Sequence, residues 1–200
     1  MGERIKKPPI LIMLSGKARS GKDTIAEIIR HEVELGIATY NHYFQTKVAT
    51  LGFADILKAM CRRNHGYENK ELSRDILLDV GDEMRDIYDD IFVSALRPFV
   101  SIYKDMGYGL IVITDTRYEN EYRRMRDYSA GITYHVNIES DNAHNGVDEV
   151  TRNHPSENID FGYDFKIQVG KLNKETYPAL VSEIRRVVGE IIDDYKEVLQ

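Results

Sequence analysis

The sequence has few of the residues that build covalent staples or membrane anchors. Cys61 is its only cysteine, which excludes an intrachain disulfide and a zinc site built from cysteines, and which favours a reducing compartment. The longest clean apolar run near the N-terminus, Ile10 to Leu14, is far shorter than a signal-peptide core or a membrane span. We therefore expect a cytoplasmic protein with no membrane partner.

Positive charge is also scarce. Lysine and arginine number 27 against 33 aspartates and glutamates, which gives a net charge of −6. A global basic field for duplex nucleic acid is therefore absent, and without a basic stripe we interpret the 13 tyrosines as core and surface residues rather than as base-stacking platforms. His135, His144 and His154 lack the spacing of metal ligands. The sequence thus predicts no nucleic-acid partner and no zinc site.

The composition is that of an ordinary globular protein. The 200 residues, with 42% hydrophobic and 30% charged side chains, correspond to one domain. A chain of this length buries roughly 70% of its unfolded surface, so it needs no metal or disulfide to fold. We expect a single domain over 1–200, with a flexible lead-in at 1–9.

Short apolar runs alternate with helical patterns along the chain, which is typical of βαβ units. Strands are expected at 10–15, 47–53, 110–115, 132–138 and 165–169. Helices are expected at 22–35, 55–63, 70–80, 82–106, 119–128 and 176–199. Gly36 is expected to stop the first helix, Gly81 to separate the third from the fourth, and Pro98 to bend the fourth. The pattern predicts a three-layer α/β fold with a five-stranded parallel sheet and helices on both faces.

A glycine-rich loop follows the first expected strand. Residues 16–22 (GKARSGK) fit G-x-x-x-x-G-K, and a helix is expected from Lys22. Glycines let consecutive N–H groups point inward around phosphate oxygens, the helix presents its positive end, and the lysine reaches the β- and γ-phosphates. The alternative is a turn that binds nothing, but the flanking strand and helix favour a phosphate loop. The predicted nucleotide-binding residues are Gly16, Lys17, Ala18, Arg19, Ser20, Gly21, Lys22, Asp23 and Thr24.

One position of this loop departs from the general motif. Asp23 stands where serine or threonine would coordinate Mg²⁺, and Thr24 comes one place later. The Asp23 carboxylate can hold a Mg²⁺-bound water or pair with a basic neighbour. Alternatively, it is only a favourable acid in the first turn of a helix. Both interpretations of Asp23 stay open.

Two charged residues mark the end of the strand expected at 110–115. Asp115 is well placed to hold Mg²⁺ or its water shell, because ligands collect at the carboxyl ends of strands in open α/β sheets. Its alternative role is to cap the next turn. Arg117 suits bidentate phosphate binding, and its alternative is a surface ion pair with Glu119 or Glu121.

Five stretches, in order along the chain, resemble the viral deoxynucleoside monophosphate kinases, a P-loop kinase family. They are 15–24 (SGKARSGKDT), 53–58 (FADILK), 81–86 (GDEMRD), 113–121 (ITDTRYENE) and 154–157 (HPSE). The set extends from Ser15 to about Val169. The animal-type phosphomevalonate kinases are also similar, through S-G-K-x-x-S-G-K-D, D-T-R and S-E.

The resemblance implies a P-loop kinase fold, ATP and Mg²⁺ as cofactors, and transfer of the γ-phosphoryl group to a deoxynucleoside monophosphate. It implies a role in deoxynucleotide biosynthesis, in the host cytoplasm if the protein is viral, and it leaves a homodimer open. The implied catalytic residues are Lys22, Asp115, Arg117 and Arg152, with Asp115 and Asp23 as metal candidates. The implied substrate-binding residues are Phe53, Asp55, Lys58, Arg85, Arg117, Glu121 and Glu157.

Several of these residues also have plainer interpretations. Phe53 could stack on the acceptor base, but such a phenylalanine is more often a core residue, and Asp55 and Lys58 suit a helix cap and a solvated face. Arg85 lies in an acidic helical stretch, where an intrahelical pair with Asp82 or Asp89 is the alternative to gripping the acceptor phosphate.

The polar segment 139–162 lacks periodicity, and we interpret it as a long loop or mobile lid. A closing lid would exclude water, and Arg152 would neutralise charge on the transferred phosphoryl group. His154 is expected to be a polar lid contact rather than a base.

Three functions remain open from the sequence. A nucleoside monophosphate kinase and a phosphomevalonate kinase share the donor site, but the acidic, non-aromatic acceptor of the second favours a more basic pocket without a stacking platform. A nucleotide-dependent switch would instead bind ATP or GTP without turnover on a small acceptor.

Overall fold

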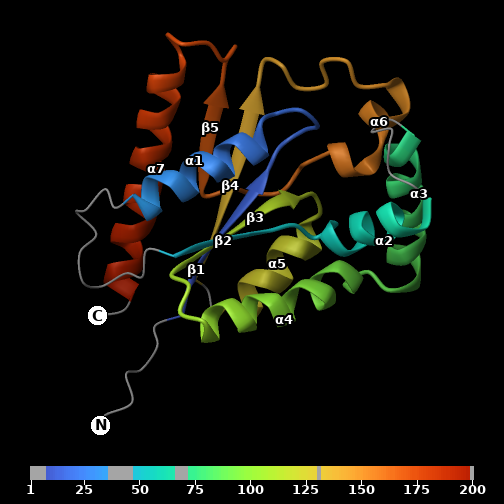
Figure 1. Ribbon diagram of the computed structural model, residues 1–200, viewed down its shortest axis with the longest axis horizontal. Coiled ribbons are helices and arrows are strands. Elements are labelled where there is room, and N and C mark those ends of the chain that lie inside the picture. The colour runs from blue at the N-terminus through green and yellow to red at the C-terminus, as the bar shows by residue number, and fades with distance from the viewer. Residues whose placement is uncertain (1–7, 36–46, 66–71, 130–131, 199–200) are drawn as a thin grey trace.

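The computed structural model describes residues 8–35, 47–65, 72–129 and 132–198 (Figure 1). The strands are β1 (Ile10–Ser15), β2 (Val48–Leu51), β3 (Leu110–Thr116), β4 (Thr133–Ser140) and β5 (Phe165–Val169). The α-helices are α1 (Lys22–Glu34), α2 (Asp55–His65), α3 (Leu72–Ile87), α4 (Ile91–Asp105), α5 (Glu119–Tyr128), α6 (Glu149–Asn153) and α7 (Tyr177–Val198), and η2 (Pro155–Glu157) is a 3-10 helix. Residues 1–7 of the expected lead-in and the expected stop at Gly36 lie outside the described ranges.

The five strands form one parallel sheet in the order β2-β3-β1-β4-β5. β1 lies at the centre and is buried along its whole length, which explains its unbroken apolar sequence. The predicted five-stranded parallel sheet is confirmed. Because all strands point the same way, the loops after β1, β2 and β3 meet at one edge of the sheet, where open α/β sheets bind their ligands.

Helices cover both faces of the sheet, and alternate residues of β1 face opposite layers. Ile12 and Leu14 pack in a core with residues of α1 and α7. Leu11 and Met13 pack in a second core with residues of α2, α4 and α5. Figure 1 shows α1 and α7 on one side of the sheet and α4 and α5 on the other. The predicted three-layer arrangement is therefore confirmed. No helix among the described residues is long and apolar enough to cross a bilayer.

The predicted helix break at Gly81 is wrong. Helix α3 runs through Gly81 to Ile87, and the break falls at 88–90, before α4. A Cβ on Gly81 would stand 3.3 Å from Arg85 Nη1 and 3.5 Å from the Leu57 side chain, so the glycine serves close packing rather than helix termination. Pro98 lies inside α4, which continues to Asp105.

The prediction that 139–162 lacks regular structure is wrong in part. β4 extends to Ser140, and α6 and η2 interrupt the segment. Asp148 caps α6, accepting a hydrogen bond from the Thr151 N–H at 2.7 Å, and Pro155 opens η2. The weak periodicity of this sequence has a simple cause, because elements of five and three residues are too short to show one.

Candidate active site

The loop between β1 and α1 curls by placing three residues at positive φ. Gly16 has φ +147°, Arg19 +61° and Gly21 +92°. A Cβ on Gly16 would lie 2.4 Å from the Ile138 carbonyl oxygen, so only glycine fits there. Backbone of this kind turns successive N–H groups into one concavity, which is the geometry of an anion-binding nest.

Lys22 opens α1, and its ammonium group is folded back onto the loop. Its Nζ donates to Gly16 O at 2.6 Å and to Lys17 O at 2.9 Å. Burial, and next the charge of Arg117, lower the pKa of Lys22 to about 8. Glu157, Asp23 and Asp115 act in the opposite direction on the same pKa. The structure thus gathers four predicted site residues around the loop lysine: Arg117, Glu157, Asp23 and Asp115.

Glu157, from η2, lies directly on the loop. Its Oε2 accepts the Ala18 N–H at 2.6 Å and lies 2.8 Å from His144 Nε2. Its Oε1 pairs with Arg117 and lies 4.0 Å from Arg74 Nη2. Burial opposes ionisation, but Arg117, the Ala18 amide and His144 together hold the pKa of Glu157 below its usual value. Sequence reasoning missed Arg74 and His144, which carry no local motif.

Arg117 connects this cluster to β3. Its guanidinium pairs with Glu157 and donates to Ser156 O at 3.2 Å. Its backbone N–H donates to Glu121 Oε2 at 2.8 Å. The alternative ion pair with Glu119 or Glu121 is therefore not the contact that the Arg117 side chain makes: the partner comes from the lid, 40 residues away.

Arg85, from α3, contacts two aromatic rings through its guanidinium group. Its guanidinium carbon is 4.5 Å from the ring centre of Phe92 and 4.2 Å from that of Tyr118. Its Nη2 donates to Glu121 Oε1 at 3.2 Å, and its Nη1 lies 3.9 Å from Asp82. The intrahelical pair with Asp82 is thus present, but the closer carboxylate is that of Glu121.

Asp115 ends β3 as predicted and holds the turn after β2. Its carboxylate accepts the N–H groups of Phe53 at 2.6 Å and Ala54 at 3.2 Å, and it lies 3.5 Å from Lys58 Nζ. Asp55 accepts the Gly52 N–H at 2.7 Å. Phe53 is 2% exposed and belongs to the core. Asp55 is the first residue of α2, and its described carboxylate contacts are with the Gly52 N–H and with Lys58. Phe53, through its backbone, and Lys58 therefore contact Asp115 directly, and Asp55 is linked to it through Lys58, whose Nζ lies 3.3 Å from Asp55 Oδ1.

Gly52, which sequence reasoning also missed, makes this turn fit. A Cβ there would stand 2.7 Å from Asp55 Oδ1 and 3.0 Å from Asp115 Oδ2. The carboxylates of Asp55 and Asp115 therefore approach the Gly52 backbone more closely than a side chain at that position would allow. A glycine directly after a short apolar strand was the available signal.

The donor set is consistent with Mg²⁺ held mainly through a ligand. In the described part of the chain, no group of three or more His, Cys, Asp or Glu side chains is arranged to hold a metal ion. Mg²⁺ in phosphate-transfer sites commonly uses only one or two carboxylates together with substrate phosphates. Asp115 and the exposed Asp23 both lie near enough to Lys22 to influence its pKa, which fits this arrangement.

Arg152 and His154 hold the lid segment together. Arg152 Nε donates to Val147 O at 3.0 Å and its Nη2 to His144 O at 3.4 Å. His154 Nε2 lies 2.8 Å from Asp82 Oδ2, which fits the expected polar contact. The lid in turn contacts the loop, since the His144 N–H donates to Ala18 O at 3.0 Å. The described contacts of Arg152 are therefore with the lid, one step away from the phosphate loop.

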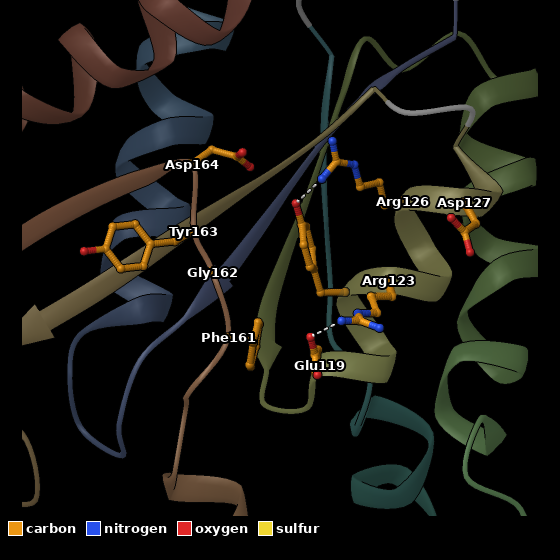
Figure 2. Close-up of a pocket in the computed structure, with 9 residues that line it drawn as sticks. Glu119, Arg123, Arg126, Asp127, Phe161, Gly162, Tyr163 and Asp164 are labelled. Atoms are coloured by element: carbon orange, nitrogen blue, oxygen red, sulfur yellow. Dashed lines mark hydrogen bonds and ion pairs between the residues drawn. The ribbon is translucent and has the colours of Figure 1, made fainter.

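A separate groove of about 440 Å³ lies between α5 and residues 161–164 (Figure 2). Arg123 lies 2.7 Å from Glu119 in this groove, and Arg126 donates to the Tyr122 hydroxyl at 3.0 Å. None of the predicted site residues lines this groove.

No family model and no curated protein matches the chain. Among solved structures it is similar to a mutant of the APS kinase CysC of Mycobacterium tuberculosis, at a TM-score of 0.46 and 12% identity over 93% of this chain and 99% of that one. It is also similar to a Chloroflexus aurantiacus J-10-fl protein assigned as a kinase, at a TM-score of 0.49 and 14% identity over 92% and 98%. At these scores and identities, the likenesses do not identify a function.

Proposed function

We propose that this protein is an ATP-dependent kinase that phosphorylates the 5′-phosphate of a deoxynucleoside monophosphate. One observation carries the phosphoryl-transfer part. The loop amide of Ala18 and the guanidinium of Arg117 both contact the Glu157 carboxylate beside Lys22, so the loop and its neighbours already hold an anion. A phosphate oxygen fits the same donors, which are charged or backbone N–H groups.

On the donor side, the loop residues 16–24 would hold the β- and γ-phosphates. Lys22 supplies a point charge, and Arg117 neutralises charge on the transferred group. Asp115 and Asp23 would hold Mg²⁺, which when bound neutralises charge on the phosphates. The phosphates must first displace Glu157 from Ala18 and Arg117, so ATP binding is coupled to movement of the lid residue that occupies their place.

On the acceptor side, Arg85, Asp55 and Lys58 lie near Asp115 and Glu121, at the carboxyl edge of β2 and β3. The motif resemblance supports a deoxynucleoside monophosphate as the acceptor. A phosphate oxygen is already a competent nucleophile near neutral pH, so no strong base is needed. Positioning and charge neutralisation supply the catalysis.

The burial of Phe53 favours a second candidate acceptor. A Phe53 ring that is 2% exposed offers no stacking platform for a base. An acidic, non-aromatic phosphomonoester such as phosphomevalonate needs none, and it would use the same arginines. Phosphomevalonate kinase activity is therefore the alternative to be tested directly.

The test is a coupled ADP-release assay across deoxy- and ribonucleoside monophosphates, with phosphomevalonate included. We expect Lys22→Ala to lower kcat/KM by about 100-fold or more, because it removes a charge that faces the transferred group, while thermal unfolding stays cooperative. Arg30→Ala, on the exposed side of the same helix, is the matched control and should retain activity.

Turnover by the Lys22→Ala variant at the wild-type rate would contradict the donor site. Activity with phosphomevalonate alone would move the acceptor assignment to the second candidate. ATP binding without turnover on any acceptor would favour a nucleotide-dependent switch.

A further inference from the structure

Two arginines given roles in the proposed reaction converge on one buried carboxylate. The Glu121 side chain is 2% exposed. Its Oε2 accepts the backbone N–H groups of Arg117 at 2.8 Å and Tyr118 at 3.2 Å. Its Oε1 accepts from Arg85 Nη2 at 3.2 Å. One oxygen therefore fixes the chain at Arg117 and the other fixes the side chain of Arg85.

The rest of the Arg85 environment leaves it little freedom to turn. The rings of Phe92 and Tyr118 contact the guanidinium, and Gly81 O accepts from its Nη1 at 3.3 Å. Among the described residues, its hydrogen bonds use two of five N–H donors, so others remain for a phosphate. Tyr118 contributes twice, through its ring to Arg85 and through its N–H to Glu121.

This carboxylate is a poor choice for stability alone. Burial raises the pKa of Glu121 to about 7, with the backbone N–H of Arg117 and the charge of Arg85 opposing the rise. Removing an ionised carboxylate from water is costly, and its contacts with Arg85 and two backbone amides do little more than offset that cost. What a neutral group cannot do is hold the Arg117 backbone and the Arg85 guanidinium at a fixed separation.

We propose that Glu121 is a positioning residue that fixes Arg85 relative to Arg117, and so aligns the acceptor phosphate with the transferred phosphoryl group. This inference rests on the proposed phosphoryl transfer and adds a residue that acts through the two arginines. It assigns Glu121 a role behind the substrate rather than in contact with it.

Glu121→Gln separates the two contacts of the carboxylate, one with the Arg117 backbone and one with the Arg85 guanidinium. Its amide oxygen can still accept both backbone N–H groups, while its NH₂ faces Arg85, where one donor meets another. We expect the acceptor KM to rise about ten-fold, with the KM for ATP within two-fold of wild type and thermal stability unchanged or higher. Glu119→Gln, on the exposed face of the same helix, is the matched control.

A double-mutant cycle tests whether the effect passes through Arg85. In an Arg85→Met background, Glu121→Gln should add no further rise in acceptor KM; a second ten-fold rise would overturn the inference. Equal rises in both KM values, or a loss of thermal stability with both KM values unchanged, would indicate a structural role and overturn it too. A wild-type chain that releases no ADP would refute the proposed function alone. The same comparison, made on the monophosphate Kd by calorimetry, would then still decide the role of Glu121.

Discussion

Two buried glutamates contact Arg117, and their surroundings shift their pKa values in opposite directions. The side chains of Glu121 and Glu157 are both 2% exposed. Yet the pKa of Glu121 rises to about 7, whereas that of Glu157 falls below its usual value. One carboxylate lies at the junction of α3 and α5, and the other lies on the phosphate loop.

The difference comes from the partners that face each carboxylate and from one like charge beside Glu121. Glu157 has Arg117, the Ala18 amide and His144 around it. Glu121 has two backbone amides and one arginine, and the nearby Asp115 opposes its ionisation. Burial penalises both groups, so the partners decide the sign. The surroundings of Glu157, on the loop between β1 and α1, therefore favour a negative charge more than those of Glu121 do.

The largest expected effect is that of Arg117→Ala, because it removes the guanidinium that pairs with the buried Glu157. Glu157 would lose its ion-pair partner while still buried, and we expect unfolding free energy to fall by about 3 kcal/mol. Turnover should fall by about 100-fold or more. Urea denaturation and ADP release measure the two effects.

The double variant Arg117→Ala/Glu157→Gln should recover part of the lost stability, since no charge is then left unpaired. An Arg117→Ala variant that unfolds at the wild-type urea midpoint would show that the buried ion pair does not contribute to the free energy of unfolding.

Opposite pH dependences should follow from the two pKa shifts. Between its usual value of 4.5 and about 7, Glu121 keeps a proton in the folded chain that the unfolded chain has released. Stability therefore falls as pH rises through that window, by on the order of 3 kcal/mol. Glu157 contributes stability above pH 4.5, and this contribution is lost as pH falls through its lower folded pKa.

Urea midpoints from about pH 3.5 to 8 check these slopes. Glu121→Gln should flatten the decline between 4.5 and 7, and Glu157→Gln should flatten the loss at low pH. If the contributions of both residues to stability changed with pH in the same direction, the opposite pKa shifts of the two glutamates would be contradicted.

A smaller effect is expected from Glu157→Gln on ligand binding. With the competing charge removed, ATP and inorganic phosphate should bind about ten-fold more tightly, which corresponds to about 1.4 kcal/mol. Isothermal calorimetry measures this directly, and Glu149→Gln, on the exposed start of α6, is the control. Weaker binding in Glu157→Gln would show that this carboxylate helps the ligand instead of standing in its place.

Much of the architecture was predictable because it depends on local patterns. The strands Ile10–Ser15 and Phe165–Val169 and the helix Glu119–Tyr128 were predicted with their observed bounds, since a short apolar run or a clear period defines each. Gly81 misled the prediction, because helix propensity cannot reveal that α2 and Arg85 pack against that position.

The local part of the candidate site was predictable, but its long-range contacts were not. The glycine spacing and the place of Lys22 belong to a motif whose geometry is local, so the sequence by itself determined the curled loop between β1 and α1. Glu157 contacts Ala18 across 139 positions of the chain, and Glu121 contacts the Arg85 side chain across 36. Glu121 also accepts the backbone N–H of Arg117. Only the tertiary structure decided those partners, because long-range pairing depends on how the layers pack around the sheet and not on the spacing of residues along the chain.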